Sequence, residues 1–531
     1  MTSVRLCAIS ACLFVLTGAL CAATITVTGR DSAAIARAIA ASKSGDTVLL
    51  PAGTYTISAT IAPQDGTRLL GAGQGKTLLR FAGDKPLTMI DLTGRMEGVE
   101  IAGLTLDALE NPNAERAIMG YNSRNLRIHH VTIRNTAPKN GNPAIHFSGD
   151  NPTFAHGVSD STIADCTFEN IGVASGWGCG VRFSWGSSRN SVLRCTIRNT
   201  GRGGVLTDNR SNDLVIRGNT ITGSGGEGLG IEVWNYCDRC VIEDNHLDHW
   251  LSIGGSDWCA ARRNVISDKT GAIKAIGIEV IGSYCIVTDN LVDDGQAIGI
   301  SVSNINAKDC VYYADNIVRR CTQWGAQFQG ETTGTSRNYL YRCAFNETTA
   351  GRGNPPYPGA DGNGFRINGD MTHSVLEECE ARDNARDGLQ LGGGNVDFLS
   401  FIKCRIVGNK GPACEGPGAY TALEWVDCTV QGNGSNALPP AKPFPTPPPS
   451  AEMLAPASAT VGNPVALLCK SDAASEVGSV VLWDFGDGIP VTGRSVKHIY
   501  DRPGKYDVAM ILWDKAGRGV RVGKTLNVTA R

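Results

Sequence analysis

The residues best suited to chemistry occupy one repeated position in ten short segments. In chain order the segments read AIHF, GVRF, GVLT, GIEV, LSIG, GIEV, GISV, GAQF, GFRI and GLQL. The shared position holds His146, Arg182, Leu206, Glu232, Ser252, Glu279, Ser301, Gln327, Arg366 and Gln390. Because side chains of a strand alternate between two faces, we expect the apolar flanks in the core and this column on the outer, solvent face.

The column contains carboxylates that are candidates for acid–base catalysis. Glu232 and Glu279 are two repeats apart with Ser252 between them, so their backbones should lie about 9.6 Å apart. Side-chain bending can bring the carboxyls into the roughly 6.5 to 9.5 Å window of an inverting glycosidase, in which one group protonates the leaving oxygen and the other activates water. Asp208, in a parallel column two residues further along each strand, is a third candidate. Its pairing with Glu232 could be shorter, so the stereochemistry stays open.

Candidate substrate contacts surround these carboxylates. Six of the nine tryptophans fall between residues 177 and 324, namely Trp177, Trp185, Trp234, Trp250, Trp258 and Trp324. Aromatic rings beside carboxylates and amides suit a sugar, whose C–H faces stack on rings while its hydroxyls form hydrogen bonds. The predicted contacts are His146, Arg182, Trp234, Trp250, Ser252, Gln327 and Arg366. The competing interpretation is an outer row that only keeps the surface soluble.

Two other functions stay open. β-Elimination on a uronic-acid polymer needs a base and a cation that neutralises the carboxylate, and His146 with Arg182 on adjacent repeats fits those roles, with Arg366 further along. The sequence shows no acidic calcium cluster and no recognisable signature of an enzyme that performs this elimination. In a non-catalytic solenoid that binds polysaccharide, Glu232 and Glu279 would only bind hydroxyls. Hydrolysis is favoured by the paired carboxylates.

The elements that position these residues follow from a repeat. Thirteen segments end at Gly103, His130, Cys166, Cys195, Asn219, Asn245, Asn264, Asn290, Asn316, Cys343, Cys379, Cys404 and Cys428, most often 24 to 27 residues apart. Such a period predicts a solenoid of short strands. Stacked at about 4.8 Å, the asparagines should form a ladder that also satisfies the backbone at a tight bend. Cys240, Cys259, Cys285 and Cys310 predict a second stacked column inside the core.

With these repeats, the chain resembles the right-handed parallel β-helix, pectate-lyase-like superfamily. The opening from Asp31 to Tyr55, DSAAIARAIAASKSGDTVLLPAGTY, resembles the amphipathic cap and first strand of many extracellular members. The resemblance implies an all-β fold with a β-helix over residues 24–436. It is specific for the fold and not for the reaction, because this fold carries lyases, hydrolases, epimerases and adhesins.

Three further segments complete the predicted domain organisation. Residues 1–23 read as a cleaved signal peptide, with Arg5, an apolar run and small residues at Ala22 and Ala23, so we expect an exported protein, extracellular or periplasmic. A proline-rich linker, residues 437–451, is predicted to be an extended spacer. Residues 452–531 resemble a PKD domain through the motif from Trp483 to Gly488, in which Asp484 and Asp487 are expected to shape a turn.

Composition limits the partners. The chain has 49 basic and 51 acidic residues without long runs of one sign, which argues against nucleic acid and leaves a polysaccharide as the expected partner. No segment after the signal is long and apolar enough to span a bilayer. The Cys237-Asp-Arg-Cys240 motif lacks a second ligand pair, so no metal or cofactor is expected, with calcium left open. The sequence names neither the polymer nor the oligomeric state.

Overall fold

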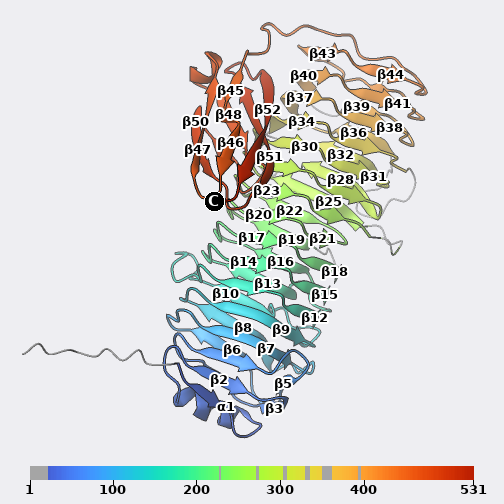
Figure 1. Ribbon diagram of the computed structural model, residues 1–531. Coiled ribbons are helices and arrows are strands. Elements are labelled where there is room, and N and C mark those ends of the chain that lie inside the picture. Colours follow the sequence, from blue (N-terminus) through green and yellow to red (C-terminus); the bar gives the residue numbers. More distant parts are fainter. Residues whose placement is uncertain are drawn as a thin grey trace, which may run out of the picture.

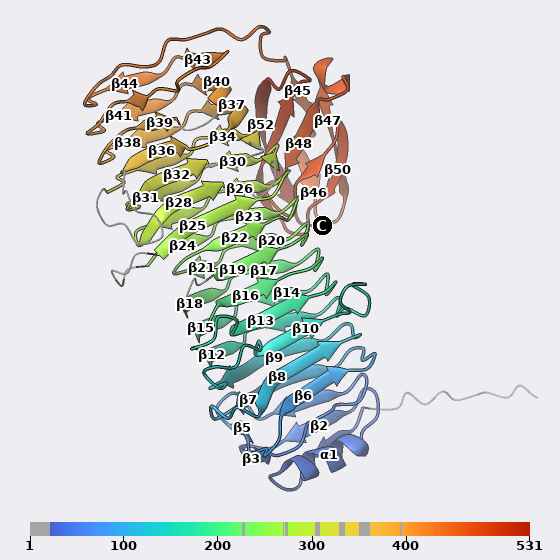
Figure 2. The same cartoon turned by 180° about the vertical axis from the view of Figure 1, so that it is seen from behind.

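The computed structural model describes residues 22–225, 229–268, 270, 274–302, 308–328, 335–349, 362–392 and 396–531. It is a parallel β-helix followed by a small β domain that lies against the side of the helix (Figures 1 and 2). The all-β fold predicted from the repeats is confirmed. Most of the predicted signal peptide lies outside the described residues.

The N-terminal end of the solenoid is capped as the sequence predicted. Helix α1 (Ser32–Ala40) begins after Asp31, whose carboxylate accepts a hydrogen bond from the backbone N–H of Ala34 at 2.8 Å. This is an N-cap that satisfies one of the free N–H groups of the first turn. Ile35 and Ile39 lie on the buried face of α1, so the helix closes the end of the solenoid core.

One strand of each central coil belongs to a 13-stranded parallel sheet, here called the front sheet. Its members are β6 (Leu87–Thr93), β8 (Ala114–Tyr121), β10 (Ile145–Ser148), β13 (Cys179–Ser184), β16 (Gly203–Thr207), β19 (Leu229–Trp234), β22 (Leu251–Gly254), β25 (Lys274–Ile281), β28 (Gln296–Val302), β32 (Trp324–Phe328), β36 (Asn363–Ile367), β39 (Leu389–Leu391) and β42 (Cys414–Glu415). These strands carry the predicted site column.

The other strands form two rows of a 31-stranded sheet. The side row contains β2 (Thr47–Leu50), β4 (Arg68–Gly71), β7 (Glu100–Asp107), β9 (Arg127–Arg134), β11 (Thr162–Ala164), β14 (Ser191–Leu193), β17 (Val215–Arg217), β20 (Val241–Glu243), β23 (Ala260–Arg262), β26 (Ile286–Thr288), β30 (Tyr312–Ala314), β34 (Tyr339–Tyr341), β37 (Met371–Glu377), β40 (Val396–Ile402) and β43 (Leu423–Val426). The back row contains β3 (Gly53–Ile57), β5 (Thr77–Phe81), β12 (Thr167–Ile171), β15 (Thr196–Thr200), β18 (Thr220–Ser224), β21 (His246–Leu247), β24 (Val265–Ile266), β27 (Leu291–Asp293), β31 (Ile317–Arg319), β35 (Ala344–Asn346), β38 (Glu380–Arg382), β41 (Arg405–Val407) and β44 (Thr429–Gln431). Short strands β1 (Thr24–Thr26), β29 (Lys308–Asp309) and β33 (Thr335–Ser336) complete the sheet.

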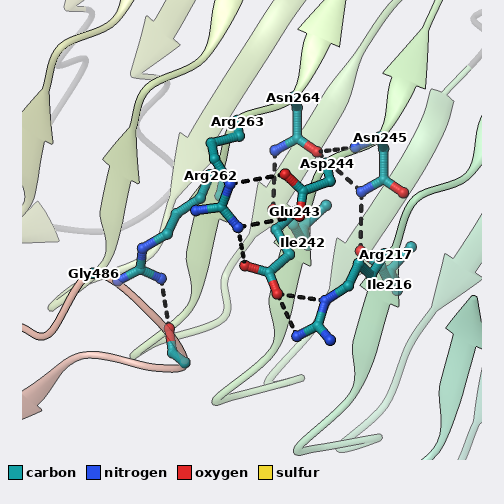
Figure 3. Close-up of polar contacts among 12 residues, drawn as sticks. Ile216, Arg217, Ile242, Glu243, Asp244, Asn245, Arg262, Arg263, Asn264 and Gly486 are labelled. Atoms are coloured by element: carbon teal, nitrogen blue, oxygen red, sulfur yellow. Dashed lines mark hydrogen bonds and ion pairs between the residues drawn. The ribbon is translucent and has the colours of Figure 1, made fainter. Parts of the chain in front are cut away.

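The predicted asparagine ladder stands at the bend between the side and back rows. The side-chain amide of each asparagine from Asn219 to Asn290 donates to the carboxamide oxygen of the next, at 2.9 to 3.0 Å. Each amide also donates to a backbone carbonyl, as Asn264 does to Ile242 at 2.9 Å (Figure 3). Two assigned members were wrong: Gly103 and His130 have positive φ and precede the ladder position, which Leu104 and Val131 fill with core side chains. A second ladder from Asn384 through Asn409 to Asn433 was not predicted.

The cysteines behave as small apolar core residues. All 15 in the described part of the chain are free thiols, and only Cys428 is not fully buried. The column from Cys240 to Cys285 is confirmed by contacts such as the Cys240 N–H donating to the Cys259 sulfur at 3.4 Å. The assignment of Cys310 to this column was wrong, because the register of Ile286 with Tyr312 places Val311 next to Cys285. Cys179, Cys237, Cys321, Cys414 and Cys469, which lie outside the predicted columns and could pair in an exported protein, are also free thiols.

A glycine begins most front-sheet segments because the coil is narrow there. A Cβ on Gly204 would lie 2.5 Å from a methyl carbon of Ile221 in β18. A Cβ on Gly299 would lie 2.1 Å from a methyl carbon of Val318 in β31. Contacts this short are sterically forbidden, so the glycine lets the back-row core side chains close the corner and fixes the outward register of the following residue.

The C-terminal domain is a two-sheet sandwich. One sheet contains β45 (Glu452–Leu454), β47 (Pro464–Lys470) and β50 (Ser495–Ile499). The other contains β46 (Ser458–Thr460), β52 (Gly519–Thr529), β51 (Gly504–Trp513), β48 (Val480–Asp484) and β49 (Val491–Thr492), and the 3-10 turn η1 (Ala473–Ser475) follows β47. Asp484 does shape a turn, because its carboxylate accepts from the Gly486 N–H at 2.8 Å.

The linker does not hold this domain away from the solenoid, contrary to the predicted spacer. The backbones of Leu423 and Lys442 exchange hydrogen bonds at 2.9 and 2.8 Å, and the Trp425 indole donates to the Pro439 carbonyl at 3.1 Å. The linker therefore packs on the last coil and turns the C-terminal domain back along the side row (Figure 1).

The contact between the two domains is buried and both apolar and ionic. Its apolar residues are Ala260, Ile286, Cys310, Tyr312, Ala314, Tyr339 and Val375 from the solenoid and Leu482, Ala509, Ile511 and Trp513 from the C-terminal domain. Arg262, only 1% exposed, reaches across to donate to Asp484 at 2.5 Å and to the Gly488 carbonyl at 2.5 Å. Figure 3 shows Arg262 extending from the solenoid toward that domain. The C-terminal domain is thus a fixed part of the molecule.

Candidate functional site

The ten residues of the predicted column are in register on the front sheet. Neighbouring pairs run from His146 opposite Arg182 to Arg366 opposite Gln390, without a slip. Their flanks, such as Ile231 and Val233, are fully buried in the core. The column therefore faces away from the core, as alternation predicted.

The column is less exposed than expected. Ser252, Gln327 and Glu279 are 2%, 3% and 9% exposed, so the expectation of an open solvent face was wrong for these coils. The physical reason is that side chains from the strand ends lie over the column. Trp250 reaches Glu279, and the Trp324 ring lies 4.5 Å from the guanidinium carbon of Arg366.

Two of the three predicted catalytic carboxylates are bound to arginines. The Arg182 Nε donates to Asp208 at 2.7 Å, and the Asn209 amide donates to the other carboxylate oxygen at 2.7 Å. Arg202 makes a bidentate ion pair with Glu232, at 2.9 and 3.1 Å. Such paired hydrogen bonds fix the carboxylate plane and are among the stronger ones in proteins.

Sequence reasoning missed Arg202. It lies before β16, outside the alternating segment, so its position relative to Glu232 on the next coil depends on how the bend folds. Its guanidinium lies 4.6 Å from the centre of the Trp177 ring, and that of Arg182 lies 5.8 Å from the same ring. Trp177 thus covers both arginines and is itself 54% exposed.

Glu279 is held by different partners. The Ser252 hydroxyl donates to its Oε2 at 2.7 Å, and the Trp250 indole N–H donates to the same oxygen at 3.3 Å. Ser252 and Trp250, both predicted substrate contacts, therefore position Glu279. These donors come from β22 and the residue before it, one coil from Glu279 in β25 and one coil from Glu232 in β19.

His146 is not a surface cation. The Ser184 hydroxyl oxygen lies 2.7 Å from its Nε2, and its Nδ1 is buried without a partner in the described part of the chain. Burial, followed by the charges of Arg182 and Arg116, lowers the pKa of His146 to about 3. The imidazole is therefore neutral at physiological pH.

Two exposed aromatic rings lie on either side of the carboxylates along the strand direction. Trp177 precedes β13, and Trp234 ends β19 and is 38% exposed. The Trp234 ring packs against Gly254 of the next coil, where a Cβ would stand 2.1 Å from a ring carbon. Ser303 and Gln329, which belong to the same parallel column as Asp208, lie outside the described residues, as does Glu227 in the glycine-rich segment before β19.

The predicted site residues form three groups. Arg182, Asp208 and Glu232 come together with Arg202, while Ser252, Trp250 and Glu279 form the next group. Gln327 and Arg366 are paired in register further along, where Arg366 packs on Trp324. Within the described ranges, no three His, Cys, Asp or Glu side chains converge as metal ligands, and no helix is long and apolar enough to cross a membrane.

The chain was compared with solved structures and with family models. Among solved structures, similar ones include the A-module of mannuronan C-5 epimerase AlgE4 from Azotobacter vinelandii, with 15% identity, TM-score 0.42 and coverage of 76% of this chain and 100% of that one. The catalytic unit of a GH87 α-1,3-glucanase from Streptomyces thermodiastaticus has 13% identity, TM-score 0.43 and coverage of 77% and 70%. An alginate lyase from Paenibacillus has 16% identity, TM-score 0.34 and coverage of 62% and 99%.

Family membership comes from the sequence. No curated protein sequence matches the chain. The family model described as "PKD domain" matches residues 446–530. The model described as "Right handed beta helix region" matches residues 93–248 and 249–436, more than half of the chain. The chain therefore belongs to the right-handed β-helix family and carries a PKD domain at its C-terminal side.

Proposed function

We propose that this protein is a secreted, carbohydrate-active enzyme that hydrolyses glycosidic bonds of an extracellular polysaccharide on the outer face of its front sheet. The observation that carries the proposal is the arrangement of three carboxylates near the exposed rings of Trp177 and Trp234: Asp208 and Glu232 lie on adjacent coils, and Glu279 lies two coils beyond Glu232. Aromatic rings stack on sugar faces, so carboxylates that lie between two such rings are placed next to the glycosidic bond. Secretion rests on the predicted signal peptide, residues 1–23.

The contacts suggest separate roles for the two glutamates. Glu232, held by the two N–H groups of Arg202, is an acceptor and suits the base that activates water. Glu279 is covered by Trp250 and hydrogen-bonded to the Ser252 hydroxyl. Because a hydroxyl can also accept a hydrogen bond from a protonated carboxyl group, Glu279 suits the acid. Asp208, bound to Arg182, orients the cation beside the cleavage point.

Elimination has less support. Its candidate base, His146, is neutral, but Ser184 occupies its Nε2 and its Nδ1 is inaccessible to solvent. Its candidate cation, Arg182, already binds Asp208. A substrate carboxylate would have to displace that ion pair, which costs a charge-assisted hydrogen bond before any is gained.

The test is a panel of neutral and uronate-containing polysaccharides, in which reducing ends and ultraviolet absorbance are followed together. Glu232→Gln and Glu279→Gln are compared with Glu169→Gln, a control on the back row with a half-exposed side chain. Reducing ends without absorbance, lost by about 10²-fold or more in both column variants and kept in the control, are expected. Absorbance that survives both variants would indicate elimination, and silence across the panel would leave a polysaccharide-binding solenoid.

A further inference from the structure

A crevice of about 520 Å³ lies between the side of the solenoid and the PKD domain. Its solenoid wall is built by bend residues of successive coils, and its other wall by β51 and β52. Domain boundaries are common locations of ligand sites, and this volume is within the range of about 300 to 1,000 Å³ typical of such sites. The crevice exists only because the PKD domain is docked on the side row.

The solenoid wall presents one carboxylate without an ion pair. Elsewhere in the same bend column, Asp165 pairs with Arg194, Asp244 with Arg263 and Asp315 with Arg342. Asp289 stands between the last two pairs, and within the described part of the chain no Lys, Arg or His nitrogen forms an ion pair with it. Its side chain is exposed into the crevice. Asp289 is therefore a carboxylate acceptor without a bound cation that lines an open, polar crevice.

The native fold disfavours a charge on Asp289. Burial by the two walls, then the charges of Asp315 and Asp484, raise the pKa of its carboxyl. The charged group thus costs stability at neutral pH, because the nearby cations do not offset the burial and the two other carboxylates. A carboxyl group that has a shifted pKa and lines a crevice is typical of a binding site.

The opposite wall supplies donors. Lys505 of β51 lines the crevice and is exposed, whereas the hydroxyl of the neighbouring Tyr506 already donates to the Arg502 carbonyl at 2.9 Å. Counted over the whole lining, five cationic side chains face four anionic ones: Arg263, Arg342, Lys505, Arg521 and Lys524 against Asp289, Asp315, Asp484 and Asp507. A balanced, hydrogen-bonding lining matches a ligand that carries many hydroxyls and no net charge.

We infer that the crevice is a second carbohydrate-binding site, which holds a neutral oligosaccharide segment with Asp289 accepting hydrogen bonds from its hydroxyls and Lys505 donating from the PKD wall. The inference rests on the proposed function only for the class of ligand. The crevice and the catalytic column are on different faces of the solenoid, because the PKD domain covers the side row and the column stands on the front sheet. The two sites bind independently.

The experiment is isothermal titration of the full chain carrying Glu232→Gln, which prevents turnover. The probes are cellopentaose, laminaripentaose and mannopentaose, with tetragalacturonate as the anionic comparison. Each probe is titrated with and without Asp289→Asn. The matched control is Asp165→Asn, which changes an aspartate of the same bend column far from the PKD domain. Melting temperature is recorded for every variant, and Asp289→Asn is expected to leave it unchanged or raised.

The expected result is that at least one neutral pentasaccharide binds, that Asp289→Asn weakens this binding at least ten-fold, and that Asp165→Asn leaves it unchanged. Binding that persists with Asp289→Asn but is lost with Trp234→Ala would belong to the front-sheet column and overturn the inference. Binding of tetragalacturonate alone, or of no probe, would also overturn it. Because the readout is equilibrium binding, the result does not depend on whether the column cleaves any polymer.

Discussion

The front sheet and the side row of the solenoid have the same strand geometry but different outward columns. The front column stays polar over most of its length. The side column reads Thr47, Arg68, Glu100, Arg127, Thr162, Ser191, Val215, Val241, Ala260, Ile286, Tyr312, Tyr339, Val375, Ser400 and Glu424. It is polar at both ends and apolar in the middle, where the PKD domain packs.

The difference shows how one solenoid separates docking from chemistry. Outward apolar side chains on the side row are covered by a domain of the same chain, so their burial stabilises the docked arrangement. Outward charges on the front sheet instead bind to neighbours along the solenoid, as Arg182 binds Asp208 and Arg202 binds Glu232. The rings of Trp177 and Trp234 stay exposed beside the front column, where the PKD domain does not pack.

The largest predicted loss of stability follows from removing the buried ion pair between Arg262 and Asp484 at the docked face. Arg262→Met leaves the buried carboxylate of Asp484 without its cation, and we expect a loss of about 3 to 5 kcal/mol in the free energy of unfolding. Urea titration followed by tryptophan fluorescence measures it. Arg194→Met, which removes an exposed pair with Asp165, is the control and should cost less than about 1 kcal/mol. Equal losses in the two variants would mean that the PKD domain is not docked in solution.

The apolar part of the same face gives the next largest effect. Ile286→Ala removes a fully buried side chain between the solenoid and the PKD domain and should cost about 2 to 4 kcal/mol. Ser191→Ala, at the equivalent outward position of an uncovered coil, should change stability by less than about 0.5 kcal/mol. The same urea titration compares them. A loss from Ile286→Ala as small as that from Ser191→Ala would contradict the docked interface.

Local regularity explains what could be predicted from the sequence. The alternation around Glu232 and Glu279 and the spacing of the asparagines each report a backbone repeat, and both the column register and the ladder from Asn219 to Asn316 were confirmed. Arg202 was missed because its contact with Glu232 depends on side-chain reach around a bend. Docking was missed although the apolar run from Val215 to Val375 marks it, because each of these residues is ordinary in a strand and the signal appears only when coils are aligned.

The front column has its own stability signature, which is set by pH. The pKa of His146 is about 3 in the native state, against the ordinary 6.5 of a free histidine side chain, so the unfolded chain binds the proton more readily. The contribution of the neutral His146 side chain to the free energy of unfolding is complete above pH 6.5 and is lost progressively as pH falls toward 3. At pH 5 the loss should be about 2 kcal/mol.

Unfolding of the parent chain and of His146→Gln is measured at pH 7 and pH 5, with His246→Gln as an exposed control on the back row. The parent chain and the control should show the same decrease in the free energy of unfolding between pH 7 and pH 5. In His146→Gln this decrease should be smaller by the contribution of His146, about 2 kcal/mol. An identical pH dependence in all three proteins would show that His146 is accessible and protonates freely in the native state.

The smallest predicted effect concerns the ring platform at the edge of the front column. In Gly254→Ala the new methyl would stand 2.1 Å from the Trp234 ring, so the ring must leave its place over the strand while the carboxylates keep theirs. If Trp234 holds a sugar, affinity for the polysaccharide should fall several-fold, about 1 kcal/mol, with the rate at saturation nearly unchanged. Gly255→Ala is unsuitable as a control because Gly255 has a positive φ, so Trp234→Ala serves as the reference for complete loss of the ring. Kinetics in which Gly254→Ala lowers the saturating rate and leaves KM unchanged would place Trp234 outside the substrate path.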